Sequence, residues 1–333
     1  MRRSGRWRVR LGVAGCLALL PLLQCKTPQK NNPPPDNLLS LEIDKSDPQT
    51  FLRYYFGPFT RPRGEDPFRA GLLVEQGGRY FLNLDSLAAF PDALGLLKQA
   101  AEAGSIGEET LEHLLERAYY AAVSPPENLD LLRQTHGYLD STDAWFWVEI
   151  DGVMTTARRH VYVPRTALRD ALSNYAKYDS RIVYPVGTIL IGEHHQDGQL
   201  VETTVMRKTS DTYWEFFVYG PDGALSHTTR TAPRRLKVPV QCVGCHTGSR
   251  LFEPEKSFPG MAPPGPEGKR HLYVDEALRN GEVVAFFNEH RRRGDAVLGI
   301  YATLYVADLL QRSRSGRFVA PEDRSVLARI GVE

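Results

Sequence analysis

The sequence predicts an α+β fold in which an antiparallel β meander is flanked by N- and C-terminal helical segments. Apolar residues recur at three- and four-residue spacing in several segments before residue 140 and after residue 273. Between them, residues 182–230 form short β-rich runs separated by turn pairs such as Asp197-Gly198. With 42% hydrophobic and 24% charged residues, the composition is that of a globular protein.

The first 24 residues predict an export signal of the lipoprotein type. Five arginines precede an apolar run that is short for a membrane span. The sequence LLQC, which ends at Cys25, resembles a bacterial lipoprotein processing site, so we expect lipidation of Cys25. Processing at Cys16 is one alternative, and a secreted protein or a retained anchor is another. We expect an extracytoplasmic protein, in the periplasm or cell envelope, held at a bacterial membrane by its lipid.

Charge indicates what the mature chain can bind, and proline content indicates a tether after the export signal. The whole chain has 41 basic and 40 acidic side chains, and loss of residues 1–24 removes five arginines and no acidic residue. The mature chain is therefore slightly acidic, and no nucleic-acid partner is implied. Residues 25–40 include Pro33-Pro34-Pro35 and are predicted to be a tether.

Residues 41–180 are predicted to form a helical or α+β region. Ser46-Asp47-Pro48 is a helix start, with Gly57 as the stop. Amphipathic spacing predicts helices over 87–103 and 108–122, and a further helix is expected over 166–178. Between them, 145–150 and 153–163 are predicted to pair as a hairpin with a tight turn at Asp151-Gly152.

The meander is predicted from four runs, 182–194, 200–208, 213–219 and 224–230. In the third run Trp214, Phe216 and Val218 share one face and Phe217 and Tyr219 the other, so both faces are expected to be covered, for which a haem would serve. Residues 266–333 are predicted to be a C-terminal helical region.

One motif carries chemistry. Cys242-Val243-Gly244-Cys245-His246 has the spacing of covalent haem c attachment, in which two thiols meet the porphyrin vinyl groups and the adjacent histidine binds iron. Zinc binding would need a second ligand pair, and a thioredoxin-type pair would need a βαβ setting. We therefore expect a haem c-binding β-rich domain over 181–265, with His246 as an axial iron ligand.

The strands before this motif resemble the cytochrome P-460 and cytochrome c′-beta family over about residues 180–255. The matching pieces are YPVGTIL from Tyr184, TVMRK from Thr204, WEFFVY from Trp214, and Pro221-Asp222-Gly223 before the haem motif. The resemblance implies a five-coordinate haem on a small antiparallel sheet, often in a homodimer, with an open side for small ligands.

Two positions depart from the oxidising members of that family. The lysine that those members bond to the porphyrin falls at Gly192, and glycine cannot make that bond. Their distal carboxylate falls near Thr204, with Glu202 on the same strand face as a substitute. Hydroxylamine oxidation is therefore not carried over with haem binding.

The second axial ligand of the iron decides between functions, because six coordination suits electron transfer and an open position suits small-ligand chemistry. The candidates are Met261 and His195, followed by His194, His227, His271 and Lys208, although Lys208 fits better as a solvated strand end. The run from His290 to Arg293 fits a helix end or the docking of an acidic redox partner.

The resulting hypothesis is an extracytoplasmic c-type cytochrome that transfers electrons to a redox partner or performs redox chemistry on a small ligand. Whether it is an enzyme stays open at this point. The alternatives are a haem oxidoreductase acting on a small nitrogenous or peroxidic substrate, and a haem-bearing sensor or structural module of an envelope assembly.

Overall fold

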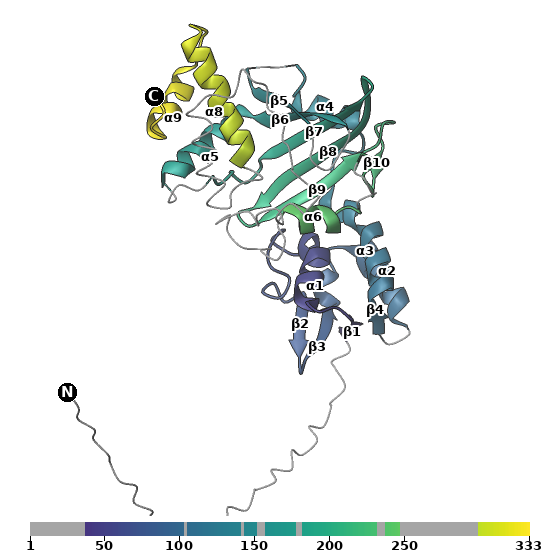
Figure 1. The fold of residues 1–333 in the computed structure, drawn as a ribbon. Coiled ribbons are helices and arrows are strands. Elements are labelled where there is room, and N and C mark those ends of the chain that lie inside the picture. The colour runs from purple at the N-terminus through teal and green to yellow at the C-terminus, as the bar shows by residue number, and fades with distance from the viewer. Residues whose placement is uncertain are drawn as a thin grey trace, which may run out of the picture. The chain divides into compact units, whose positions relative to one another are not determined.

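The computed structural model confirms the α+β class, with two separate sheets and helices near both termini (Figure 1). It describes residues 37–102, 105–140, 143–151, 157–177, 182–231, 237–246 and 299–333. The export signal, Cys16, Cys25, Met261, His271 and the basic run at His290 lie outside these residues. Among the helices of the described ranges, none combines the length and the apolar character needed to span a bilayer.

A mixed four-stranded sheet forms the N-terminal part. Its order is β2-β3-β1-β4, from β1 (Leu38–Glu42), β2 (Leu73–Gln76), β3 (Arg79–Asn83) and β4 (Ser105–Gly107). Strand β1 is antiparallel to β3 and parallel to β4. The sequence did not predict these strands, and β1 overlaps the last residues of the expected tether.

Helices pack on this sheet around a core that includes Leu52, Leu82 and Leu111. Helix α1 (Pro48–Phe56) starts as predicted, because the Asp47 side chain accepts a hydrogen bond from Thr50 N at 3.1 Å. Helices α2 (Pro91–Ala101) and α3 (Glu108–Val123) confirm the amphipathic prediction, and two short 3-10 turns, η1 (Gly57–Phe59) and η2 (Asp85–Leu87), lie between the longer elements.

The second sheet is the predicted antiparallel meander, extended by the predicted hairpin to six strands in the order β10-β9-β8-β7-β6-β5. The strands are β5 (Trp145–Asp151), β6 (Arg158–Pro164), β7 (Ile189–Gln196), β8 (Gln199–Ser210), β9 (Tyr213–Tyr219) and β10 (Leu225–Ser226). The remaining helices are α4 (Leu129–His136), α5 (Arg165–Lys177), α6 (Val240–His246), α8 (Gly299–Arg314) and α9 (Pro321–Arg329).

Three boundaries differ from the prediction. Asp151 pairs with Arg158, so the hairpin connection is longer than the expected two-residue turn. The first strand of the meander begins at Ile189 rather than at residue 182, and the last has only two residues. The turn pattern predicted the order of strands but not their ends, because pairing with the neighbouring strand decides where each one starts.

Strand β9 is buried along its whole length, as its alternation predicted. Two tyrosine hydroxyls of helix α3 bond the backbone of β9 at its edge. The Tyr119 hydroxyl donates to Phe216 O at 2.7 Å and accepts from Phe216 N at 3.0 Å, while Val218 N donates to the Tyr120 hydroxyl at 3.3 Å. Tyr119 thus closes the edge at Phe216, where β10 is too short to pair with it, and Tyr120 bonds Val218 opposite Ser226 of β10.

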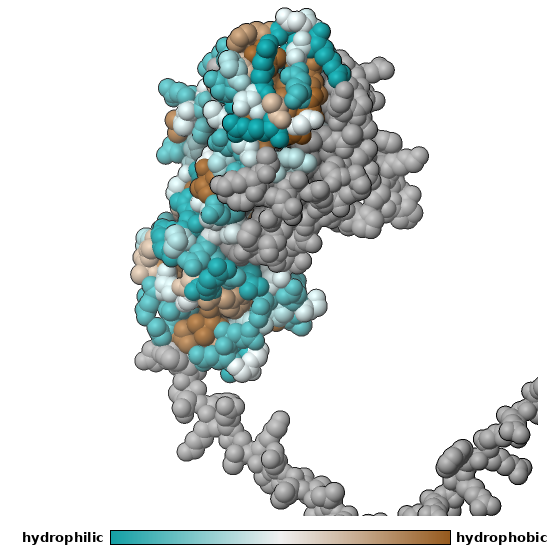
Figure 2. Space-filling view, turned by 90° about the vertical axis from the view of Figure 1, so that its left-hand side faces the viewer, coloured by the Kyte–Doolittle hydropathy of each residue, from teal (hydrophilic) through white to brown (hydrophobic). Residues whose placement is uncertain are grey.

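A buried carboxylate connects the N-terminal segments to the meander. Glu215 on β9 is bonded by Arg207 at 2.8 Å and by Arg63 at 3.4 Å, and both arginines also donate to Val123 O at the end of α3. On the side seen in Figure 2, hydrophilic residues cover most of the described surface, and the hydrophobic ones form small separate groups.

Candidate functional site

The CxxCH motif forms the short helix α6, which contacts α1 and strand β9. Positions 242 and 245 are three apart on this helix and therefore share one side of its backbone. Val243 is buried against the meander, and Cys242 is half-buried. Burial raises the pKa of the Tyr120 hydroxyl, and the nearby Cys242 adds to that rise.

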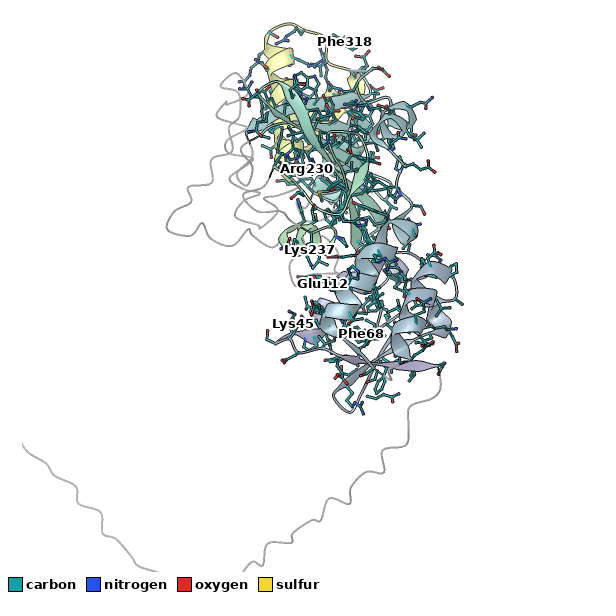
Figure 3. The ribbon with its side chains drawn as sticks, turned by 90° about the vertical axis from the view of Figure 1, so that its right-hand side faces the viewer. Lys45, Phe68, Glu112, Arg230, Lys237 and Phe318 are labelled. Carbon is teal, nitrogen blue, oxygen red and sulfur yellow. The ribbon has the colours of Figure 1, made fainter. Side chains whose placement is uncertain are left out.

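Contacts before and within α6 fix its position. Lys237 bridges to Glu112 and Glu116 of α3 at 3.3 Å each, and Figure 3 shows Lys237 and Glu112 side by side. Gly244 faces Tyr54 of α1, where an added Cβ would lie 3.8 Å from the ring. The motif therefore depends on the N-terminal helices as well as on the meander.

His246, the last residue of α6, turns its imidazole to the meander. Its ring lies 5.3 Å from that of Phe216, and its Nδ1 is buried without a hydrogen-bond partner among the described residues. Burial, with a smaller contribution from the positive charge of Arg159, lowers the pKa of His246 to about 4. The imidazole is therefore neutral at physiological pH, which is the form that binds a metal ion.

The sheet register shows which side chains share the face of His246. Phe216 is opposite Met206, Thr204 is opposite Gly192, and His194 is opposite both Glu202 and Arg159. Because side chains alternate along each strand, these residues lie on one face of the meander, which we name the His246 face.

A connected polar group lies on the His246 face. Glu202 accepts from the Thr231 hydroxyl at 2.8 Å and from Arg230 N, and Thr231 Oγ1 is 3.0 Å from His194 Nδ1. His194 Nε2 is 3.0 Å from Thr204 Oγ1, which is 3.4 Å from Gly192 O. Four side chains from three segments therefore form one hydrogen-bonded chain.

Burial sets the protonation of this chain. It lowers the pKa of His194 well below its ordinary value, and the charge of Arg159 acts in the same direction. It raises the pKa of Glu202, against the hydrogen bonds from Arg230 N and Thr231. Arg159 has no ion-pair partner among the described residues, and its Nε is buried without a hydrogen bond. His194 is thus neutral, and a guanidinium is available beside it.

No family model, curated protein or solved structure matches this chain. A helix turn with two cysteine positions on one side and a neutral histidine directed to a covered sheet face fits a covalently attached haem. No cluster of three or more histidine, cysteine, aspartate or glutamate side chains that could hold a metal ion occurs in the described ranges.

Of the other ligand candidates, His195, His227 and Lys208 lie within the described residues. His195 lies on the opposite face of the meander, where its ring is 4.7 Å from that of His160. His227 lies against Tyr120, with ring centroids 4.5 Å apart. The expectation of a solvated Lys208 is wrong, because its side chain is buried and donates to Tyr184 O at 2.7 Å.

Sequence reasoning missed Arg159 and Thr231. Neither belongs to a motif, and Arg159 meets His194 only through the pairing of β6 with β7, which a single sequence does not specify. The available signal was the alternating direction of side chains along a strand over 158–163, which would have placed Arg159 on the same face as Val161 and Val163.

Proposed function

We propose that this chain is an extracytoplasmic c-type cytochrome with one haem attached covalently through Cys242 and Cys245 and with His246 as an axial iron ligand. One observation carries the proposal: the CxxCH sequence ends in a neutral imidazole that lies against the meander, 5.3 Å from Phe216. When bound, the haem would supply one-electron redox chemistry and an iron coordination position.

Between the two modes of action, small-ligand redox chemistry has more support than electron transfer. The described residues of the His246 face include an unpaired arginine and a chain of proton-bearing groups, whereas electron transfer needs neither. The ligand classes that suit these groups are small nitrogenous and peroxidic molecules. The resemblance to the cytochrome P-460 and c′-beta family points the same way, without the lysine link.

The absorption spectrum of protein matured with a haem c assembly system tests the proposal. We expect a reduced haem c spectrum and a haem that stays with the polypeptide in a denaturing gel, both lost in Cys242→Ala/Cys245→Ala. His246→Asn should keep the covalent haem and change its spin state, because it removes an iron ligand but no thiol. His136→Asn, a half-buried histidine at the end of α4 that packs against Trp145, is the matched control and should leave the spectrum unchanged. Covalent haem in the double cysteine variant would refute the attachment.

Carbon monoxide added to the reduced protein separates the two modes of action. A shifted spectrum supports an accessible iron and small-ligand chemistry, and an unshifted low-spin spectrum supports a second protein ligand and electron transfer. In the second case Met261 is the first residue to replace.

The location and assembly of the protein are part of the same proposal. Lipidation at Cys25 would tether the folded part to the membrane, and labelling with a radioactive fatty acid in cells, with Cys25→Ala and Cys16→Ala compared, distinguishes the two processing sites. Size-exclusion chromatography with light scattering tests the homodimer. A sensor or structural role in an envelope assembly is the alternative if the haem binds no added ligand and accepts no electrons.

A further inference from the structure

Three side chains converge on one point above Gly192. A Cβ built on Gly192 would lie 3.1 Å from Thr204 Oγ1, 3.4 Å from an Arg159 terminal nitrogen and 3.8 Å from His194 Nε2. A guanidinium, a hydroxyl and an imidazole nitrogen are thus directed to one small region on the His246 face. Arg159 and Thr204 are half-buried, whereas His194, Glu202 and Thr231 behind them are buried.

We propose that this region holds a small anionic ligand of the haem, bound by Arg159, and that the chain Thr204, His194, Thr231 and Glu202 carries a proton between the ligand and Glu202. This inference rests on the proposed function, because it places the ligand on the face where His246 lies. It names the substrate class as small weak acids or their anions.

The positive charge of Arg159 is the first support. No carboxylate among the described residues pairs with Arg159, although the charge acts on His194, Glu202 and His246. A guanidinium on a covered sheet face is stabilised by an anion in bidentate or single hydrogen-bond contact. The neighbouring Arg158 differs, because it lies on the opposite face, bonds Glu149 at 3.3 Å and is exposed.

The order of donors along the chain is the second support. When Glu202 is ionised it accepts from the Thr231 hydroxyl, so Thr231 oxygen accepts from His194 Nδ1–H, and His194 Nε2 accepts from the Thr204 hydroxyl. Thr204 oxygen then accepts from whatever acid lies above Gly192. All four contacts can be filled with one proton each, in a single direction.

Binding of a weak acid HX moves one proton along this hydrogen-bonded chain and reverses the direction in which its hydrogen bonds are donated. HX gives its proton to Thr204 Oγ1, whose own proton passes to His194 Nε2. The His194 Nδ1 proton passes to Thr231 Oγ1, and the Thr231 proton passes to Glu202. The products are X⁻, which stays beside Arg159 and accepts from Thr204, and a protonated Glu202. One proton has left the ligand and one has arrived at Glu202, and no electron has moved.

The environment of Glu202 suits this role. Its pKa is raised by burial, so it accepts a proton more readily than a solvated glutamate. In the described part of the chain, Arg159 and His194 are the charged or titratable side chains that act on it. The Arg230 backbone donates to its second oxygen, and the Arg230 side chain is exposed (Figure 3).

Cyanide binding to the oxidised, haem-loaded protein tests the inference. Hydrogen cyanide is protonated at neutral pH and binds iron as the anion, so its association requires a proton acceptor. Thr231→Val keeps the side-chain shape and removes the link, and we expect association at neutral pH to slow by roughly tenfold or more. At alkaline pH, where cyanide is already an anion, the rate should recover. Thr203→Val is the matched control, because Thr203 is a buried neighbour whose hydroxyl bonds none of the described residues.

Arg159→Gln tests the anion contact, with Arg158→Gln as its control. We expect affinity for cyanide to fall roughly ten- to a hundredfold in Arg159→Gln at both pH values and to stay unchanged in the control. Glu202→Gln, which cannot accept a proton, replaces Thr231→Val if the latter fails to fold.

Each outcome decides the inference. Equal association rates in Thr231→Val and Thr203→Val would overturn the proton path. An unchanged affinity in Arg159→Gln, with an altered haem reduction potential, would assign Arg159 to a carboxylate of the haem instead and overturn the ligand contact. Absence of covalent haem from the unmodified protein, visible before cyanide is added, would overturn the proposed function and the ligand region together.

Discussion

Replacement of Tyr119 by phenylalanine should loosen the edge of the strand on which His246 packs. The Tyr119 hydroxyl makes two hydrogen bonds to the same residue, donating to Phe216 O at 2.7 Å and accepting from Phe216 N at 3.0 Å. Both partners are backbone groups of a fully buried strand. Tyr119→Phe removes one oxygen atom and leaves an amide and a carbonyl without a partner.

The size of the effect follows from those two groups. A buried polar group that loses its partner costs about 1–3 kcal/mol, and a carbonyl costs less than an amide because of its second lone pair. The ring stays, so packing contributes little. We expect the free energy of unfolding to fall by about 2–4 kcal/mol, which is a large part of the stability of an ordinary domain.

Urea unfolding followed by tryptophan fluorescence measures this change. The midpoint should fall while the slope of free energy against urea stays constant, since the same surface is exposed on unfolding. Tyr80→Phe is the matched control, because Tyr80 is partly buried on β3 and its hydroxyl bonds no other described residue. A Tyr119→Phe midpoint equal to that of Tyr80→Phe would refute the claim that the hydroxyl holds the edge of β9.

Three further predictions concern the same fold. Asp323→Asn should lower the free energy of unfolding by roughly 2–4 kcal/mol, because Asp323 accepts hydrogen bonds from Arg169 at 2.6 Å and from the Tyr305 hydroxyl at 2.5 Å. Urea midpoints measure this change, with the exposed Glu322→Gln variant as the control. Glu215→Gln should cost a similar amount, roughly 2–4 kcal/mol, by leaving Arg63 and Arg207 without a carboxylate, and thermal melts compared with exposed Glu149→Gln would show it. Haem-free protein should lose stability as pH falls from about 6.5 to about 4, since the pKa of His246 is lowered on folding and the unfolded chain binds the proton first; a melting temperature equally steep in His246→Asn would contradict this.

Local signals predicted much of this fold from the sequence. Asp47 and Pro48 mark the start of α1 because capping and the first-turn proline act within a few residues. The turn pairs of the meander are also local signals, since Asp197 and Gly198 both adopt positive φ between β7 and β8. Such features depend on neighbours in sequence, so one chain is enough to read them.

The four-stranded sheet escaped prediction because its strands are short and pair across distance. Strand β4 has three residues and joins β1 from more than sixty positions away, so neither alternation nor spacing marks it. One signal was present: Gly77 and Gly78 have positive φ and connect Gln76 to Arg79 across a two-residue hairpin turn. A pair of glycines between apolar runs would have suggested β2 and β3.

The candidate site likewise has one part that local sequence predicts and one part that depends on strand pairing. The haem motif is contiguous and was found, whereas the polar group on the His246 face requires the register of the three strands β6, β7 and β8 and the return of Thr231 over Glu202. Lys208 shows the limit of a residue-type argument, because a lysine near a strand end is usually solvated and this one is buried against Tyr184 O.

Gly192 lies on the His246 face, beside the polar group that we propose to bind the ligand. The resemblance that we propose to the cytochrome P-460 and c′-beta family would place the porphyrin-bonded lysine of its oxidising members at this position. A Cβ here would lie 3.1 Å from Thr204 Oγ1, so Thr204 would have to shift by a few tenths of an ångström, and 3.4 Å from the Arg159 guanidinium, which is ordinary contact. A haem on the His246 face would therefore meet a guanidinium and a proton-bearing chain where those members have a covalent link.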